Sequence, residues 1–431
     1  MRAERVEEMP RGRARSLNPL IPPPSTFFFS RTRHAHAANP SLSSTATLTD
    51  ALPRVRLADL APGEFAARFE RPRLPCVISD AADGWPAPPG HALWTPAGLG
   101  AALGSARLKV GTDDGGHGVR LGFDDFLDYA ADPGHGRVDD CPLYVFDGGF
   151  ADSETDTSSS SGDDGGGGEP HPPTAAGAAG RPRRRVRRRR RSGPGAAIAA
   201  AYCIPAPFRE DLLCAAGPRR RPPHRWLVVG PPRSGSGLHV DPLATAAWNT
   251  LLRGRKRWAL FPPGTPAALV APREAGLGRE APDWFAAVYP RSRAPGWQGP
   301  PVLDCVQEAG ETVYVPGGWW HAVLNLPSAD GGRAHEPDLA VAVTQNFVSS
   351  ANFARVWPAA AVARPRMAAK WLQALDTVAG RADLARAAVR LTGAGLDAGT
   401  GSSASSSSSS GSSSTSSSDD GGEGRARPME R

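Results

Sequence analysis

The chain has 431 residues, of which 40% are hydrophobic, 49 are Gly and 44 are Pro. Three stretches, 1–45, 150–200 and 396–431, are poorer in apolar residues than the rest of the chain and are not expected to build a core. This leaves about 300 residues for one large folded domain. Because no apolar run reaches the ~18–20 residues of a membrane helix, we predict no membrane-spanning segment.

The formal net charge of +7 is concentrated in one segment. Arg181–Arg191 contains nine arginines, so the rest of the chain is close to neutral. Such a run is typical of a nuclear-localisation or nucleic-acid-contacting segment, which binds phosphates with a strong salt dependence; a solvated insertion without a partner is the alternative. The sequence therefore predicts a nuclear protein, with the cytoplasm as a second location. Five cysteines without a CxxC pair argue against a disulfide framework or a zinc knuckle.

The first third of the chain contains one globular stretch between two low-complexity ones. Residues 1–45 are predicted to be a disordered leader, and 150–200, acidic and then Arg-rich, a low-complexity insertion. Between them, 46–149 have apolar residues at helical or strand spacing. This spacing predicts helices over 57–69, 94–103 and 123–129, and strands over 76–79, 107–111 and 143–146.

Residues 201–360 have the densest strand pattern of the chain. Gly and Pro turns separate short apolar runs, which predict strands over 226–229, 238–240, 247–252, 257–261, 312–315, 320–326 and 339–347. Many short strands with such turns are typical of a sandwich or barrel. Helices over 367–375 and 382–391, in the segment 361–395, are expected to close the fold before a disordered Ser-rich tail at 396–431. The predicted fold class is mainly β, with flanking N- and C-terminal helices.

Two histidines and an aspartate form the first candidate site. His239 lies in a predicted strand and Asp241 is two residues further on, so in extended backbone both side chains point to one face. A surface histidine beside a turn aspartate would give the same pattern. His321 follows two tryptophans and a Gly-Gly turn, and its alternative is a buried core histidine. Two histidines and one carboxylate are the ligands that leave three adjacent positions open on Fe(II). Zinc could bind them as well, although no HExxH helix offers a general base.

Lys256 indicates what could occupy the open positions. It alternates with Trp258 on a predicted hairpin that turns at Gly254, so its ammonium either reaches water from an apolar face or meets an anion inside the protein. The predicted strand 339–347 presents small residues and then Thr344 on one face, which leaves room for a ligand. A dicarboxylate fits, with one end on a metal and the other held by Lys256 and Thr344.

Four blocks of the sequence resemble a known family. They are Arg225–Pro242, Ala247–Trp258, Val315–His321 and Val343–Phe347. The blocks are similar to the Jumonji-C (JmjC) Fe(II)- and 2-oxoglutarate-dependent oxygenases, in particular the branch of bifunctional arginine demethylases and lysyl-hydroxylases, the phosphatidylserine-receptor-like proteins. Weaker similarity covers 52–147 and 353–375. The resemblance implies a double-stranded β-helix (jelly-roll or cupin) barrel.

The resemblance also assigns a role to each candidate residue. It implies that Fe(II) is held by His239, Asp241 and His321. It implies that the distal carboxylate of 2-oxoglutarate is held by Lys256 and Thr344, with Asn249, Ser236 and Tyr144 as further pocket residues. Ser236 stands where relatives commonly have Thr, and Ala244 replaces a usual Gly. Trp226, Trp319 and Trp320 are expected either to wall the pocket or to be ordinary core residues.

The implied activity consumes O2 and 2-oxoglutarate, releases succinate and CO2, and hydroxylates protein side chains. Lysyl hydroxylation, histone arginine demethylation, or both would follow, with a histone or an RNA-associated protein as substrate. Two alternatives stay open: a non-catalytic cupin scaffold that binds RNA or chromatin through Arg181–Arg191, and an oxygenase of RNA or of a small metabolite. The intact ligand set argues against the scaffold. The sequence does not predict the oligomeric state.

Overall fold

The computed structural model describes residues 36, 39–44, 48–112, 117–151, 194–329, 336–377 and 380–392. Within these ranges the strands form two main sheets and a two-stranded ribbon, β3 (Arg107–Thr112) with β4 (Gly118–Gly122). The larger sheet has the order β1 (Arg54–Val55), β2 (Cys76–Ile78), β11 (Thr312–Val315), β8 (Ala246–Arg253), β13 (Ala340–Phe347), β6 (Arg225–Gly230), β5 (Val145–Asp147). The smaller sheet has the order β10 (Leu303–Gln307), β9 (Arg255–Phe261), β12 (Trp320–Leu326), β7 (Gly235–His239). Only β1 and β2 pair in parallel among these strands.

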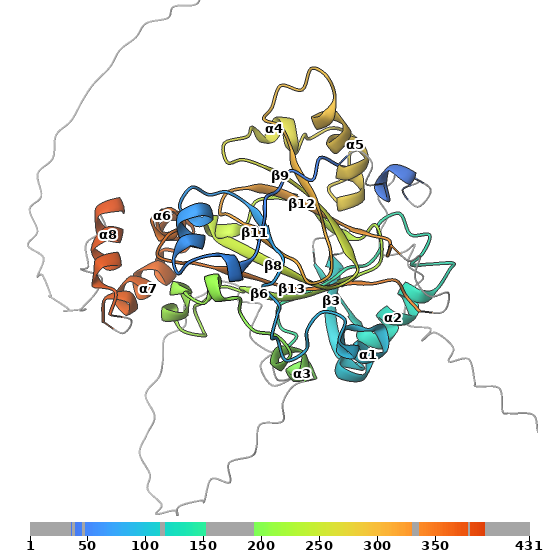
Figure 1. Ribbon diagram of the computed structural model, residues 1–431, viewed down its shortest axis with the longest axis horizontal. Coiled ribbons are helices and arrows are strands. Elements are labelled where there is room, and N and C mark those ends of the chain that lie inside the picture. Colours follow the sequence, from blue (N-terminus) through green and yellow to red (C-terminus); the bar gives the residue numbers. More distant parts are fainter. Residues whose placement is uncertain are drawn as a thin grey trace, which may run out of the picture. The chain divides into compact units, whose positions relative to one another are not determined.

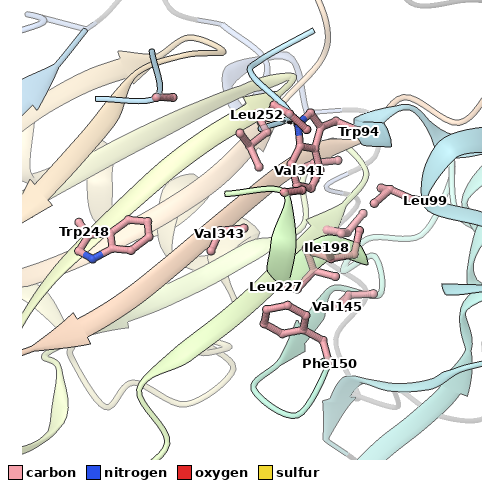
Figure 2. Close-up of a cluster of buried hydrophobic side chains, with 14 of the residues drawn as sticks. Trp94, Leu99, Val145, Phe150, Ile198, Leu227, Trp248, Leu252, Val341 and Val343 are labelled. Atoms are coloured by element: carbon pink, nitrogen blue, oxygen red, sulfur yellow. Dashed lines mark hydrogen bonds between the residues drawn. The ribbon is translucent and has the colours of Figure 1, made fainter. Parts of the chain in front are cut away.

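Successive side chains of a strand point to opposite faces of the sheet, so each strand contributes to two separate layers of the core. On β13, Val341 and Val343 belong to a cluster on the outer face of the larger sheet, whereas Ala340 and Ala342 belong to a cluster on the opposite face. The parity predicted for this strand is therefore confirmed. Figure 2 shows part of the outer cluster, in which side chains of β6, β8 and β13 lie against Trp94 and its neighbours from the N-terminal part.

The connection at Gly254 differs from the hairpin predicted for it. Strand β8 pairs with β11 and β13 of the larger sheet, whereas β9 pairs with β10 and β12 of the smaller one. The chain thus passes from one sheet to the other within a single residue. Gly254 has a φ of +79°, and a Cβ there would lie 2.8 Å from Cα of Ala340. A glycine turn has the same sequence signal whether it joins paired strands or changes sheets, which is why the prediction was wrong.

Helices cover the outer faces of both sheets and one end of the fold (Figure 1). The larger sheet packs against α1 (Pro96–Leu103), α2 (Phe123–Ala131) and α3 (Ala196–Ala200), and the smaller sheet against α4 (Ala267–Val270) and α5 (Ala281–Arg293). A separate apolar cluster unites α6 (Phe353–Ala363), α7 (Pro365–Thr377) and α8 (Ala382–Thr392). None of the helices in the described part of the chain has the length and hydropathy needed to cross a membrane.

The predicted strands of the region 201–360 are all present, and the predicted helices near 94–103, 123–129, 367–375 and 382–391 are confirmed. Seven strands and α-helices of the described part were missed: β1, β4, β10, α3, α4, α5 and α6. Proline explains α5, because Pro282 stands in its first turn, where the missing N–H is harmless, and Pro290 lies inside it. Strand β10, Leu303–Gln307, has no regular alternation of apolar and polar residues, and its pairing with β9 rather than its composition makes it a strand.

Two segments predicted to be of low complexity extend into the fold. Within the leader, Pro40–Leu42 forms a 3-10 turn, and Leu42 is buried at 1% exposure beside β9 and α5. Within the insertion, α3 buries Ile198 against the larger sheet. Residues 1–35 of the leader, the arginine run, the whole tail 396–431 and 330–335 of the connection before β13 lie outside the described residues.

Candidate metal centre and cosubstrate pocket

Neighbouring strands β7 and β12 bring together the three side chains expected to bind a metal. His239 and His321 are opposite each other in the antiparallel register, with ring centroids 4.2 Å apart. Asp241 lies just after the end of β7, and its Oδ1 is 3.7 Å from Nε2 of His239 and 3.9 Å from Nε2 of His321. One ligand atom from each residue falls within 4.8 Å of the other two.

Hydrogen bonds orient the two imidazoles so that their Nε2 atoms are acceptors. Nδ1 of His239 lies 2.8 Å from the carbonyl of Gly237, and Nδ1 of His321 lies 3.2 Å from the carbonyl of Trp319. Since a carbonyl only accepts, each Nδ1 carries the proton and each Nε2 has a free lone pair. Burial, reinforced by the neighbouring His239, lowers the pKa of His321 to about 4, so this ring is neutral at neutral pH.

One oxygen of the Asp241 carboxylate also lacks a donor. Oδ2 of Asp241 is buried and has no hydrogen-bond partner among the described residues. A buried carboxylate oxygen without a donor is costly, and two lone pairs and a carboxylate meeting at one place fit a divalent cation. The side chain of His239 is 42% exposed, so the triad is open on one side.

A pocket of about 250 Å³ adjoins the triad. All eight side chains singled out from the sequence line it: Tyr144, Ser236, His239, Asp241, Asn249, Lys256, His321 and Thr344. They come from β7, β8, β9, β12 and β13 and from the residues flanking β5 and β7. The fold thus gathers residues that are up to 200 positions apart in the chain.

Lys256 is the most unusual member of this set. Its side chain is 0% exposed, and its Nζ lies 3.3 Å from the hydroxyl of Tyr144 and 5.6 Å from the centre of that ring. No carboxylate among the described residues pairs with it. Burial lowers the pKa of Lys256 to about 7. Of the two sequence-based alternatives, an ammonium that reaches water is excluded, and the site fits an anionic ligand.

Polar groups continue around this ammonium. Thr344 is opposite Asn249 in the register of β13 and β8, and its hydroxyl donates to the carbonyl of Trp248 at 2.8 Å. Oδ1 of Asn249 is buried without a partner among the described residues. Tyr144 shares a hydrogen bond with Ser236, and burial raises the pKa of its hydroxyl, which keeps it protonated. The pocket therefore combines one cation, several neutral donors and apolar walls.

The aromatic walls differ in part from those expected. Trp226 lines the pocket, but Trp319 and Trp320 belong to core clusters and donate their indole N–H groups to the carbonyls of Arg73 and Thr265. Trp258, noted only as a neighbour of Lys256 in the strand pattern, stacks on His321 at 6.2 Å and 25°. Further lining residues that were missed are Phe146, Val228 and Val323. Phe146 could have been found, because it alternates with Tyr144.

The backbone just after Asp241 is strained at two positions. Ala244 has a φ of +54° and Leu243 a φ of +57°, both in the left-handed region. Glycine adopts this conformation without strain, whereas a side chain disfavours it. Ala244 therefore adds backbone strain three residues from a metal-ligand candidate.

Comparison with known proteins identifies the family. A sequence profile described as "JmjC domain, hydroxylase" matches residues 226–329. The "bifunctional arginine demethylase and lysyl-hydroxylase psr-1" of Caenorhabditis briggsae is 35% identical over 328 residues, which cover 75% of this chain and 68% of the relative. The chain belongs to the JmjC hydroxylases. The protein of the same name from Caenorhabditis elegans is 34% identical over 76% of this chain and 68% of its own length. The human "2-oxoglutarate and iron-dependent oxygenase JMJD4" is 34% identical over 31% of this chain and 29% of its own.

As a JmjC hydroxylase, the chain is an enzyme that depends on Fe(II), 2-oxoglutarate and O2. The acceptor triad and the buried ammonium agree with this dependence, since the one fits a divalent cation and the other a carboxylate.

Proposed function

We propose that this JmjC hydroxylase oxidises lysyl or arginyl side chains of a protein substrate. Hydroxylation of a side-chain carbon gives a stable alcohol, and hydroxylation of an N-methyl carbon removes the methyl group as formaldehyde. The observation that carries the proposal is the acceptor triad and the uncompensated ammonium of Lys256 in one pocket. Support for the substrate class comes from the relatives, whose names describe an arginine demethylase and lysyl-hydroxylase.

In this proposal each pocket residue has a defined task. His239, Asp241 and His321 hold Fe(II), which together with 2-oxoglutarate supplies the oxidising chemistry when bound. Lys256 and Thr344 hold the distal carboxylate of the cosubstrate through a charge-assisted and a neutral hydrogen bond.

The remaining groups of the pocket orient these residues and exclude water from the reacting atoms. The Nδ1 hydrogen bonds fix both imidazoles, Tyr144 positions the ammonium, and Ser236 and Asn249 offer further polar contacts. The wall of Trp226 and Trp258 excludes water from the reacting atoms.

We also infer that β6 to β13 form a double-stranded β-helix. The supporting observation is the strand order, β11-β8-β13-β6 in one sheet and β10-β9-β12-β7 in the other. Consecutive strands mostly alternate between the sheets, as in the eight-stranded jelly roll of the cupins.

Release of succinate tests the enzymatic part of the proposal. The full-length chain with Fe(II) and 2-oxoglutarate should release succinate in the presence of lysine or methyl-arginine peptides, and His239→Ala should abolish this. His91→Ala, an exposed histidine outside the pocket, is the matched control and should retain it. Mass spectrometry distinguishes the gain of one oxygen from the loss of one methylene. If the native chain released no succinate with any substrate, the non-catalytic scaffold would replace this proposal.

We further propose that the chain is nuclear and contacts nucleic acid through Arg181–Arg191. Support comes from the nine arginines and from the place of the insertion, whose flanking residues Phe150 and Gly195 are in close contact just after β5. Replacing the run by Gly and Ser should weaken binding to a single-stranded RNA, reduce the salt dependence of that binding and release a fluorescent fusion from the nucleus. Unchanged binding and location would contradict the proposal.

A further inference from the structure

A second pocket, of about 310 Å³, adjoins the cosubstrate pocket. The two share Tyr144, Phe146, Ser236 and His239 in their walls. We call the second one the outer pocket. Its other walls come from β3, the residues 141–143 and the start of α5. Because His239 lines both pockets and its side chain is 42% exposed, a substrate side chain bound in the outer pocket would lie beside the triad.

The outer pocket contains a carboxylate without a partner. Glu280 immediately precedes α5, lines the pocket and is exposed. No hydrogen bond or ion pair joins its carboxylate to another described residue. Partial removal from water and the nearby Asp283 raise its pKa, and Asp283 itself is 2.8 Å from Nε2 of His36. A cation bound at Glu280 would relieve this unfavourable environment of the charged carboxylate.

An aromatic ring faces the same space. Phe146 is 36% exposed, although Val145 and Asp147 on either side of it in β5 are buried. It stacks on Trp226 at 5.4 Å and 30°, and Tyr144 lies 6.3 Å away. The face of an aromatic ring attracts a cation, and most strongly where water is partly excluded. An exposed phenylalanine lining a pocket next to a carboxylate is suited to a flat or methylated cationic group.

We infer that the outer pocket selects substrate side chains by their positive charge, with Glu280 as the counter-charge and Phe146 as the aromatic face. This inference rests on the proposed function, because it is the shared His239 that brings the bound cation next to the metal candidate. Glu280 repels the phosphates of RNA, so the pocket favours a cationic protein side chain over a nucleotide. Lys109, which lines the outer pocket from β3, carries the opposite charge. Its replacement should therefore change the affinity for cationic peptides in the opposite direction and serves as a control.

The test compares peptides that differ only in charge. Three peptides of one neutral sequence carry a single lysine, arginine or norleucine, and two readouts are made on the full-length chain: peptide affinity by fluorescence anisotropy without iron, and succinate release with Fe(II) and 2-oxoglutarate. We expect the native chain to bind the cationic peptides about tenfold more tightly than the norleucine peptide, as a charge-assisted contact allows.

Three variants separate charge from shape. Glu280→Gln should lower the affinity for the cationic peptides about tenfold and leave that for norleucine within about twofold. Phe146→Leu should lower the cationic affinity roughly threefold to fivefold. Lys109→Gln should change it in the opposite direction, raising it about twofold to threefold. Unchanged thermal unfolding of each variant shows that the fold is retained.

Several outcomes would overturn the inference. Equal affinity of the native chain for charged and neutral peptides is one, and an equal loss for both peptides in Glu280→Gln is another, because it would indicate a structural role. Succinate release stimulated by a single-stranded RNA but by no peptide would assign the pocket to nucleotides. Succinate release without charge selectivity would refute this inference and leave the proposed function standing. Charge-selective binding without succinate release would support this inference and refute the proposed function.

Discussion

Replacing Lys256 by Met examines whether the ligand-free protein tolerates an uncompensated charge. The side chain is 0% exposed, and the one hydrogen-bond partner of its ammonium among the described residues is the hydroxyl of Tyr144 at 3.3 Å. Burial lowers its pKa from 10.5 to about 7. A tenfold change in a protonation equilibrium is worth about 1.4 kcal/mol, so this shift corresponds to an upper limit of roughly 5 kcal/mol. Methionine fills nearly the same volume without charge, and we expect Lys256→Met to raise the free energy of unfolding by about 2–4 kcal/mol at pH 7.

The gain should depend on pH in a defined direction. Below pH 7 the ammonium of Lys256 is charged in both the folded and the unfolded chain, so the full penalty is present. Between about 7 and 10.5 unfolding takes up a proton, and the stability of the native chain therefore rises with pH relative to the variant. Above pH 10.5 the advantage of Lys256→Met should vanish. Urea unfolding at pH 6, 7.5 and 9 measures this trend.

The affinity for 2-oxoglutarate should change in the opposite sense to stability. Lys256→Met is expected to bind the cosubstrate at least about 100-fold more weakly, because the distal carboxylate loses a charge-assisted hydrogen bond in a dry pocket. In the native chain this affinity should be constant below pH 7 and fall above it, as the neutral amine must first gain a proton. Anaerobic calorimetry measures both effects.

A second lysine supplies the control for these measurements. Lys370 is exposed on α7 and donates only to Gln373, at 3.5 Å, so Lys370→Met should change stability by less than about 0.5 kcal/mol and leave cosubstrate binding intact. A Lys256→Met protein that is less stable than the native chain at pH 7, or that binds 2-oxoglutarate equally well, would refute the reasoning.

Three further substitutions test the metal site and two backbone positions. Asp241→Asn removes the charge but keeps the shape; Fe(II) affinity, followed by spectroscopic titration, should fall at least about 100-fold, and the metal-free protein should unfold within about 1 kcal/mol of the native chain. Gly254→Val should lower the free energy of unfolding, measured by chemical denaturation, by about 3–5 kcal/mol, because strain from its positive φ adds to a clash with β13. The control is Gly264→Val, where φ is +88° and the space around the residue is open. This substitution should lower the free energy of unfolding by only about 1–2 kcal/mol. Ala244→Gly should stabilise by about 0.5–1 kcal/mol by relieving its left-handed backbone, and a loss of stability would show that the methyl group packs.

Features that depend on local spacing could be predicted from the sequence. The parity of β13 places Thr344 and the small residues on the pocket side, and the two-residue spacing of His239 and Asp241 gives them a common direction. The strand prediction for this pair was only half right. His239 ends β7 and Asp241 lies beyond it, yet the two side chains still converge.

Features that depend on the choice of partner could not be predicted. The turn at Gly254 gives no sign that β8 and β9 belong to different sheets, because strand pairing is decided by contacts far along the chain. The position of Glu280 in the pocket could not be predicted either. In the sequence it is a loop residue before a proline-containing helix, and only the packing of α5 beside β7 brings it to the pocket. The tryptophans near His321 are a further example. Trp319 and Trp320 directly precede His321 in the sequence, but it is Trp258, on the neighbouring strand, that stacks on it.

The polar groups that are expected to bind the ligands are also the groups that lower the stability of the protein without them. Asp241, Asn249 and Lys256 each keep a buried polar group without full compensation in the ligand-free chain, and each lowers the free energy of unfolding. These are also the groups from which a cation and a dicarboxylate gain the most, because no hydrogen bond within the protein has to be broken before the ligand binds. Asn249 and Lys256 lie on paired strands and Asp241 directly follows one. Their unmet hydrogen-bonding capacity and charge therefore favour binding of the ligands.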